Sequence, residues 1–104
     1  MEGEIRMKPI KERIGLPALL ECTAEEALEF AHACLKYARK LRNENPTPKE
    51  IKDIKDNIHE ELADVSLCID ELWNAGELDS QLVEEIIDMK LKRWHKRLDE
   101  MEDK

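Results

Sequence analysis

Residues 51–73 read IKDIKDNIHEELADVSLCIDELW, with apolar residues at helical spacing along one side. Counting from Glu61 in helical steps reaches Ile54, Val65, Cys68 and Leu72, which form one apolar stripe. The spacing predicts an amphipathic helix with a carboxylate in the middle of its buried face. An ionised carboxylate is costly in an apolar setting unless it is paired, protonated or bound to a metal ion.

The acidic pattern of this helix also occurs 35 residues earlier in the chain. Glu26 and Glu29 stand three positions apart, as Glu61 and Asp64 do, so each pair lies on one side of a helix. Carboxylates that point into a shared interior repel one another unless a cation lies between them. Because hard cations such as Mg²⁺ prefer oxygen ligands, we predict that these four carboxylates bind a divalent cation.

The other elements follow from periodicity and from helix-breaking residues. We expect a first helix at about 17–42, a loop at 43–48, a second helix from a capping box at Thr47 to Trp73, and a last helix from Asp79-Ser80 onward. Residues 1–15 are expected to be a partly ordered N-terminal segment, residues 16–98 the helical domain, and residues 99–104 a fraying tail. The expected fold class is all-α, a bundle of three main helices per chain.

The first helix predicts an assembly, because it is apolar over more than half of its circumference. Three helices of one small chain cannot easily cover such a helix on all sides. We therefore expect homo-oligomerisation, most simply a two-fold dimer, to complete the bundle.

Composition excludes several classes of partner. The net charge of −8 and the lack of a dense basic arm argue against nucleic-acid binding. No apolar run is long enough for a membrane span, and we expect a cytoplasmic protein with no membrane partner. The three cysteines have no CxxC spacing, so a zinc site is not favoured, and Cys34 and Cys68 are expected to be small buried thiols.

Cations on two helices are candidate phosphate ligands. Lys90 lies on the apolar stripe of the last helix with Arg93 and Arg97 nearby, and Lys36 lies on the first helix. We expect Lys90 and Arg97 to neutralise phosphate oxygens across the bundle from the metal. We expect Lys36, on the Glu29–Ala33 side of the first helix, to assist them. Asn57, one turn before Glu61, is a candidate for contact with the metal shell or the substrate.

Simpler interpretations stay open for individual residues. Thr23 and Glu26 match a capping box, so Glu26 would only cap a helix that starts late. Lys90 is equally explained by a side chain that reaches solvent or pairs with a buried Glu61.

A second kind of metal site is also conceivable from the sequence. Glu29-x-x-His32 and Asp56-x-x-His59 match parts of the Glu-x-x-His pattern of di-iron bundles. Both histidines, however, are expected on the polar faces of their helices, where the ligands would not converge.

Four segments carry a family resemblance: AEEALEFAHACLKYAR, NPTP, NIHEELADVSLCIDEL and KLKRWHKRL, within residues 16–98. Together they resemble the all-α nucleotide pyrophosphohydrolases of the MazG-like family, whose ExxE and ExxD motifs match Glu26-x-x-Glu29 and Glu61-x-x-Asp64. The resemblance implies cleavage of a nucleoside triphosphate between its α- and β-phosphates, giving the monophosphate and pyrophosphate. It also implies Mg²⁺ as cofactor, with Mn²⁺ as a substitute, and a dimer or a dimer of dimers.

In the implied mechanism, Glu25 or Glu29 orients or deprotonates the attacking water, and Lys90 and Arg97 hold the β- and γ-phosphates. The alternative is a non-catalytic helical module for dimerisation or adaptor binding, with a vestigial metal site.

Overall fold

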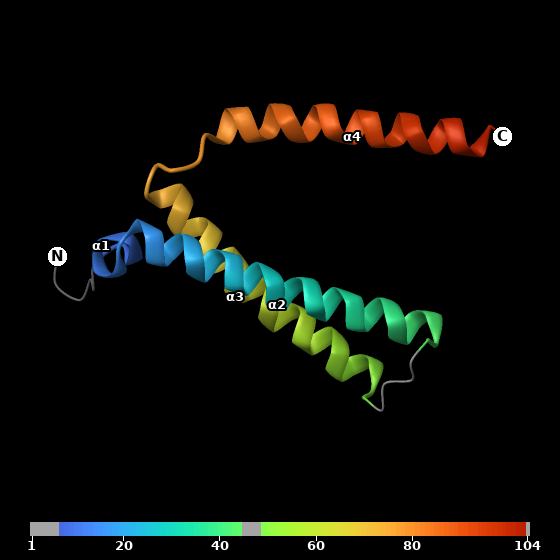
Figure 1. Ribbon diagram of the computed structural model, residues 1–104, viewed down its shortest axis with the longest axis horizontal. Coiled ribbons are helices and arrows are strands. Elements are labelled where there is room, and N and C mark those ends of the chain that lie inside the picture. Colours follow the sequence, from blue (N-terminus) through green and yellow to red (C-terminus); the bar gives the residue numbers. More distant parts are fainter. Residues whose placement is uncertain (1–6, 45–48, 104) are drawn as a thin grey trace, which may run out of the picture.

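In the computed structural model, which describes residues 7–44 and 49–103, every regular element is an α-helix. The helices are α1 (Ile10–Ile14), α2 (Leu16–Arg42), α3 (Ile51–Asn74) and α4 (Ser80–Glu102), as Figure 1 shows. The predicted all-α class is confirmed. Within the described residues, no helix is both long and apolar enough to cross a membrane.

The core lies between α2 and α3, which run antiparallel as a helical hairpin (Figure 1). Leu19 and Ala33 are buried from α2, and Ile54, Val65 and Leu72 from α3. The three buried residues of α3 lie on the stripe that the sequence predicts. The helical period therefore identified the packed face of this helix correctly.

Most helix ends match local chemistry. Asp79 caps α4, because its Oδ1 accepts a hydrogen bond of 3.1 Å from the Leu82 N–H. Gly76 takes a positive φ of 74° just after α3 ends. The predicted start of the second helix was wrong, since α3 begins at Ile51 rather than next to Thr47, which lies outside the described residues.

Helices lie near both ends of the described chain. α1 falls within the segment predicted to be partly ordered, and Lys11 forms an ion pair of 3.0 Å with Glu77. The Ile10 N–H also points to the Glu71 carboxylate at 3.5 Å. At the other end α4 continues to Glu102, so residues expected to fray are helical.

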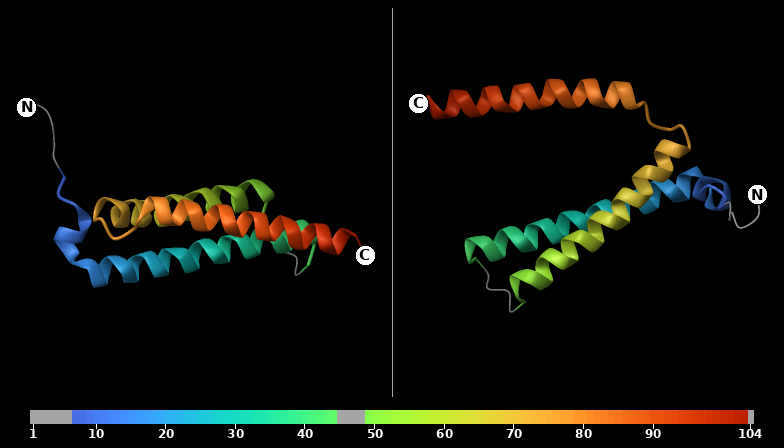
Figure 2. Two further views of the ribbon diagram at one scale, coloured as in Figure 1. Left: turned by 90° about the horizontal axis from the view of Figure 1, so that it is seen from above. Right: turned by 180° about the vertical axis from the view of Figure 1, so that it is seen from behind.

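Helix α4 does not pack along any other described helix. Figures 1 and 2 show it standing apart from the α2–α3 hairpin, and none of its residues is buried. The radius of gyration is 18.7 Å, whereas a compact chain of this length has about 13 Å. Three helices therefore do not form a bundle within the single chain, and completion of the bundle by a homo-oligomer stays a prediction.

Candidate metal centre

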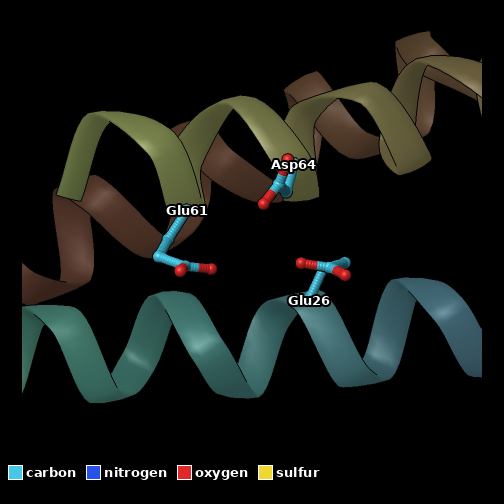
Figure 3. A group of neighbouring side chains, drawn as sticks. All are labelled: Glu26, Glu61 and Asp64. Atoms are coloured by element: carbon cyan, nitrogen blue, oxygen red, sulfur yellow. The ribbon is translucent and has the colours of Figure 1, made fainter. Parts of the chain in front are cut away.

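Three carboxylates converge between the two helices of the hairpin. Glu26 comes from α2, and Glu61 and Asp64 come from successive turns of α3. One oxygen of each side chain lies within 4.8 Å of the others, and Figure 3 shows the three side chains pointing toward one another. The antiparallel register of α2 and α3 thus brings the ExxE and ExxD patterns to the same level.

The electrostatics of this cluster are unfavourable for three negative charges. Burial raises the pKa of Glu61, and the nearby Asp64, Glu29, Glu26 and Glu60 raise it further. Glu26 and Glu61 are half-buried, whereas Asp64 is exposed. The cluster therefore favours either a proton on Glu61 or a cation between the carboxylates.

The other two predicted acidic residues are not part of the converging set. Glu29 is close enough to raise the pKa of Glu61, but it is exposed and its oxygens are not among the three that converge. Glu25 is also exposed. The placement leaves both free to contact water or ligand rather than to complete the converging set.

The donor set fits a hard divalent cation. All three groups offer carboxylate oxygens, which Mg²⁺ and Mn²⁺ prefer. Two ligands of one Mg²⁺ lie no more than about 4.2 Å apart, so small side-chain rotations suffice to bring these oxygens together. Mg²⁺ commonly keeps several waters and takes only a few carboxylates, which suits a half-open cluster.

A small cavity of about 70 Å³ lies farther along the hairpin. Lys36 and Asn57, both predicted from the sequence, line it together with Lys49, Asp53 and Ile54. Asn57 stands one helical turn from Glu61, so the cavity adjoins the carboxylate cluster. The sequence reasoning missed Lys49 and Asp53, although Asp53 is one turn before Asn57 on the same face.

The cations of α4 are not part of this arrangement. Lys90, Arg93 and Arg97 are exposed on a helix that does not pack on the hairpin. A single chain therefore does not place them opposite the carboxylates, and their position across a bundle completed by a second copy stays a prediction. In the described part of the chain, Lys90 also does not pair with Glu61.

The structure argues against two alternative interpretations, a capping role for Glu26 and a di-iron site at His32 and His59. α2 begins at Leu16, and the Thr23 hydroxyl donates to the Leu19 carbonyl at 2.8 Å, so Thr23 is inside the helix and does not cap it. His59 Nδ1 lies 2.7 Å from its own helix at Lys55 O. His32 is exposed, and neither histidine joins the converging carboxylates.

The cysteines differ from the prediction in one case. Cys34 is exposed in the single chain, so its expected burial was wrong. Cys22 and Cys68 are half-buried and free, and burial raises the pKa of the Cys68 thiol. A raised pKa disfavours the thiolate that would bind zinc or attack an electrophile.

Comparison with known proteins adds no assignment. No protein-family model, no curated protein and no solved structure matches this chain.

Proposed function

We propose that the chain is a Mg²⁺-dependent nucleoside triphosphate pyrophosphohydrolase of the MazG-like type. The observation that carries the proposal is the convergence of Glu26, Glu61 and Asp64 within 4.8 Å, in the two motifs on which the resemblance rests. In the reaction a water oxygen bonds to the α-phosphorus while the bond from that phosphorus to the α,β-bridging oxygen breaks. Pyrophosphate leaves, and the nucleoside monophosphate remains.

The acidic residues have different proposed roles, according to whether they belong to the converging set. Glu26, Glu61 and Asp64 would hold Mg²⁺ or Mn²⁺, which supplies positive charge against the phosphates and acidifies a bound water. Glu29, which is near enough to raise the pKa of Glu61, or Glu25 orients the attacking water and accepts its proton. Their exposed carboxylates lie outside the converging set, as such a role requires.

Substrate binding is expected along the hairpin, beside the metal centre. Lys36 and Asn57 line the adjoining cavity, where an ammonium group and an amide can bond phosphate or sugar oxygens. While α4 lies away from the hairpin, Lys90, Arg93 and Arg97 cannot contact the carboxylate cluster of their own chain. Their proposed role in binding the β- and γ-phosphates therefore requires a homo-oligomer, a dimer or a dimer of dimers.

A second candidate function is a non-catalytic dimerisation or adaptor module. The uncovered α4 favours it, because an amphipathic helix without an intramolecular partner is a common docking element. On this reading the carboxylate cluster is vestigial.

One experiment separates the two candidates. Pyrophosphate release is measured over ribo- and deoxynucleoside triphosphates, with Mg²⁺ and with a chelator, while thermal unfolding is followed under the same conditions. Mg²⁺-dependent release from at least one triphosphate supports the enzyme. An absence of release from all of them, together with no stabilisation by Mg²⁺, supports the adaptor.

A further inference from the structure

Two of the three cysteines lie next to the carboxylate cluster, one on each helix of the hairpin. Cys22 stands four residues before Glu26 on α2, and Cys68 stands four residues after Asp64 on α3. Because α2 and α3 run antiparallel (Figure 1), these two steps lead in the same direction along the hairpin, by about 6 Å at 1.5 Å per residue. The convergence of Glu26 with Asp64 therefore places Cys22 and Cys68 at the same level, one turn beyond the cluster.

The side chain of Cys68 reaches α2 at this level. Burial raises the pKa of the Cys68 thiol, and among its neighbours Cys22 raises this pKa most, ahead of Glu26. The Cys68 sulfur also hydrogen-bonds the side chain of Thr23, which follows Cys22 in the sequence. Both cysteines are half-buried and free. The two thiols therefore lie beside each other between the helices.

The spacing of packed helices suits a disulfide at such positions. Axes of helices in contact lie about 8–10 Å apart, and each Cα lies about 2.3 Å from its axis. Cα atoms on the line of contact are therefore about 3.5–5.5 Å apart, and those beside this line are somewhat farther apart. A disulfide joins Cα atoms about 4.4–6.8 Å apart, so it fits half-buried residues at one level of the hairpin.

The third cysteine provides an internal contrast. Cys34 lies twelve residues after Cys22 on α2, about 18 Å farther along the helix, and its side chain is exposed. It cannot reach Cys68 while the hairpin is folded. Cys34 is therefore expected to react as a single exposed thiol, whereas the other two form a pair.

The raised pKa of Cys68 affects both the formation and the reduction of a disulfide. A thiol that is seldom ionised attacks slowly, but it is also a poor leaving group when the disulfide is reduced. A disulfide at this position is expected to form slowly and to be lost slowly. These properties suit a reversible link between helices rather than a catalytic disulfide, which depends on a thiol of low pKa.

We propose that Cys22 and Cys68 are a site of reversible oxidation, whose intramolecular disulfide links α2 to α3 beside the metal centre. The oxidant is a low-molecular-weight disulfide such as oxidised glutathione. The thiolate of one cysteine attacks this disulfide and releases one molecule of reduced glutathione. The thiolate of the other cysteine then attacks the mixed disulfide and releases the second molecule. The protein loses two protons and two electrons, which convert the oxidant into two thiols.

The disulfide is expected to strengthen binding of the metal ion. In the reduced hairpin, separation of the helices relieves the repulsion among Glu26, Glu61 and Asp64. A bond one turn away restricts this separation, so the oxidised chain holds the three ligands together before the ion binds. This effect on the metal ion rests on the proposed function, whereas formation of the disulfide does not.

Oxidation is tested on the whole chain, incubated to equilibrium in buffers of oxidised and reduced glutathione. The Cys34→Ala variant, which keeps only the paired thiols, should lose about 2 Da and stay a single covalent chain. Cys22→Ala or Cys68→Ala in the same background should not lose this mass. In the wild type, peptide mapping should find the bond between Cys22 and Cys68. Two free thiols, a stable mixed disulfide with glutathione on either residue, or a covalent dimer would overturn the proposal.

Two further measurements test the link between the helices. Oxidation should raise the Tm of Cys34→Ala by about 10 °C or more, because the bond closes a long loop of the unfolded chain. Mn²⁺ should bind the oxidised chain about tenfold more tightly than the reduced chain, as followed by electron paramagnetic resonance of the free ion. The same oxidant should change neither quantity when Cys68 is replaced by alanine. Equal affinity for Mn²⁺ in both states, with the bond in place, would overturn the effect on the metal centre.

Failure of this inference is distinct from failure of the proposed function. If the reduced chain binds Mn²⁺ and no disulfide forms, the inference is wrong and the metal centre stands. If the disulfide forms but neither state binds Mn²⁺, the metal centre and its regulation are both wrong. Circular dichroism under reducing conditions controls for folding of each variant, and peptide mapping of the wild type needs no variant.

Discussion

Helices α3 and α4 are nearly equal in length, with 24 and 23 residues, and both have an amphipathic pattern. Only α3 buries its stripe, at Ile54, Val65 and Leu72, whereas α4 has no buried residue. The difference lies in what stands beside each helix along the chain. α3 runs back along α2 and packs on it, while α4 leaves the hairpin at Gly76 (Figure 1). An apolar stripe thus shows that a face will be covered without showing which chain covers it.

The charged residues divide in the same way. The acidic residues that converge, Glu26, Glu61 and Asp64, all lie in the hairpin and meet within one chain. The cations expected to complement them, such as Lys90 and Arg97, lie on α4 and remain exposed. Metal binding is therefore expected to be a property of the hairpin, and phosphate binding a property of the assembly.

The strongest test of the hairpin as metal centre is Glu61→Gln. The amide keeps the shape but removes the charge from the most central ligand, so Mg²⁺-dependent pyrophosphate release should fall by about 100-fold or more. Asp70→Asn is the matched control, since it makes the same change on the opposite face of α3. Full turnover by Glu61→Gln would remove this residue from the site.

The packed and unpacked regions should differ in their sensitivity to truncation of a leucine. Leu19 is 2% exposed in the hairpin core, so Leu19→Ala should lower the free energy of unfolding by about 2–5 kcal/mol. Leu67→Ala, at an exposed position of α3, should change it by no more than about 0.5 kcal/mol. Urea unfolding measures both, and equal effects would contradict the assignment of the core.

Two lysines separate the roles of the hairpin and α4 in substrate binding. Lys36→Ala and Lys90→Ala should each raise KM for the triphosphate by about tenfold with little change in kcat, because each removes a charge-assisted contact. Dilution distinguishes them: as the wild type dissociates, its KM should approach that of Lys90→Ala, while the effect of Lys36→Ala persists. If Lys90→Ala instead unfolds the chain without a kinetic signature, Lys90 is structural.

The spacing of residues along the sequence was sufficient to predict how the two helices of the hairpin pack. The stripe around Glu61 predicted the buried face of α3, and the repeated spacing of Glu26 and Glu61 predicted their convergence, because both depend on helical period and on one antiparallel turn. The same reasoning placed the start of α4 at Asp79-Ser80, where the structure shows that the Asp79 side chain caps the helix.

The position of α4 relative to the hairpin could not be predicted from the spacing of its residues. Lys90 lies on the stripe of α4 in either case, but its distance from Glu61 depends on the direction in which the chain leaves Gly76 and on other copies. Cys34 was assigned to the core although it is exposed in the single chain.

The carboxylate cluster should make stability depend on pH. The pKa of Glu61 is raised by folding, so the folded chain holds that proton more tightly than the unfolded chain does. Without metal, stability should therefore rise as pH falls through the window from the raised pKa to the ordinary carboxyl pKa. Mg²⁺ offsets the same repulsion, so it should stabilise the chain more at neutral pH than within this window. Thermal unfolding of Glu61→Gln should lose most of this pH-dependent contribution, and an unchanged profile would show that another group is its source.

The smallest expected effect concerns the start of α4. Asp79→Ala removes the oxygen that accepts the Leu82 N–H at 3.1 Å, and loss of such a cap costs about 1 kcal/mol. Because α4 does not pack on another helix of its chain, this cost should appear as fraying of its first turn. The free energy of unfolding of the hairpin should not change. Hydrogen exchange should show faster exchange at residues 82–84 and unchanged protection in α2 and α3. Asp79→Asn, which keeps an acceptor oxygen, should restore most of the protection. A loss of protection in the hairpin on Asp79→Ala, at a concentration where the protein is monomeric, would mean that α4 packs on its own chain, and the contrast between the two regions would then be wrong.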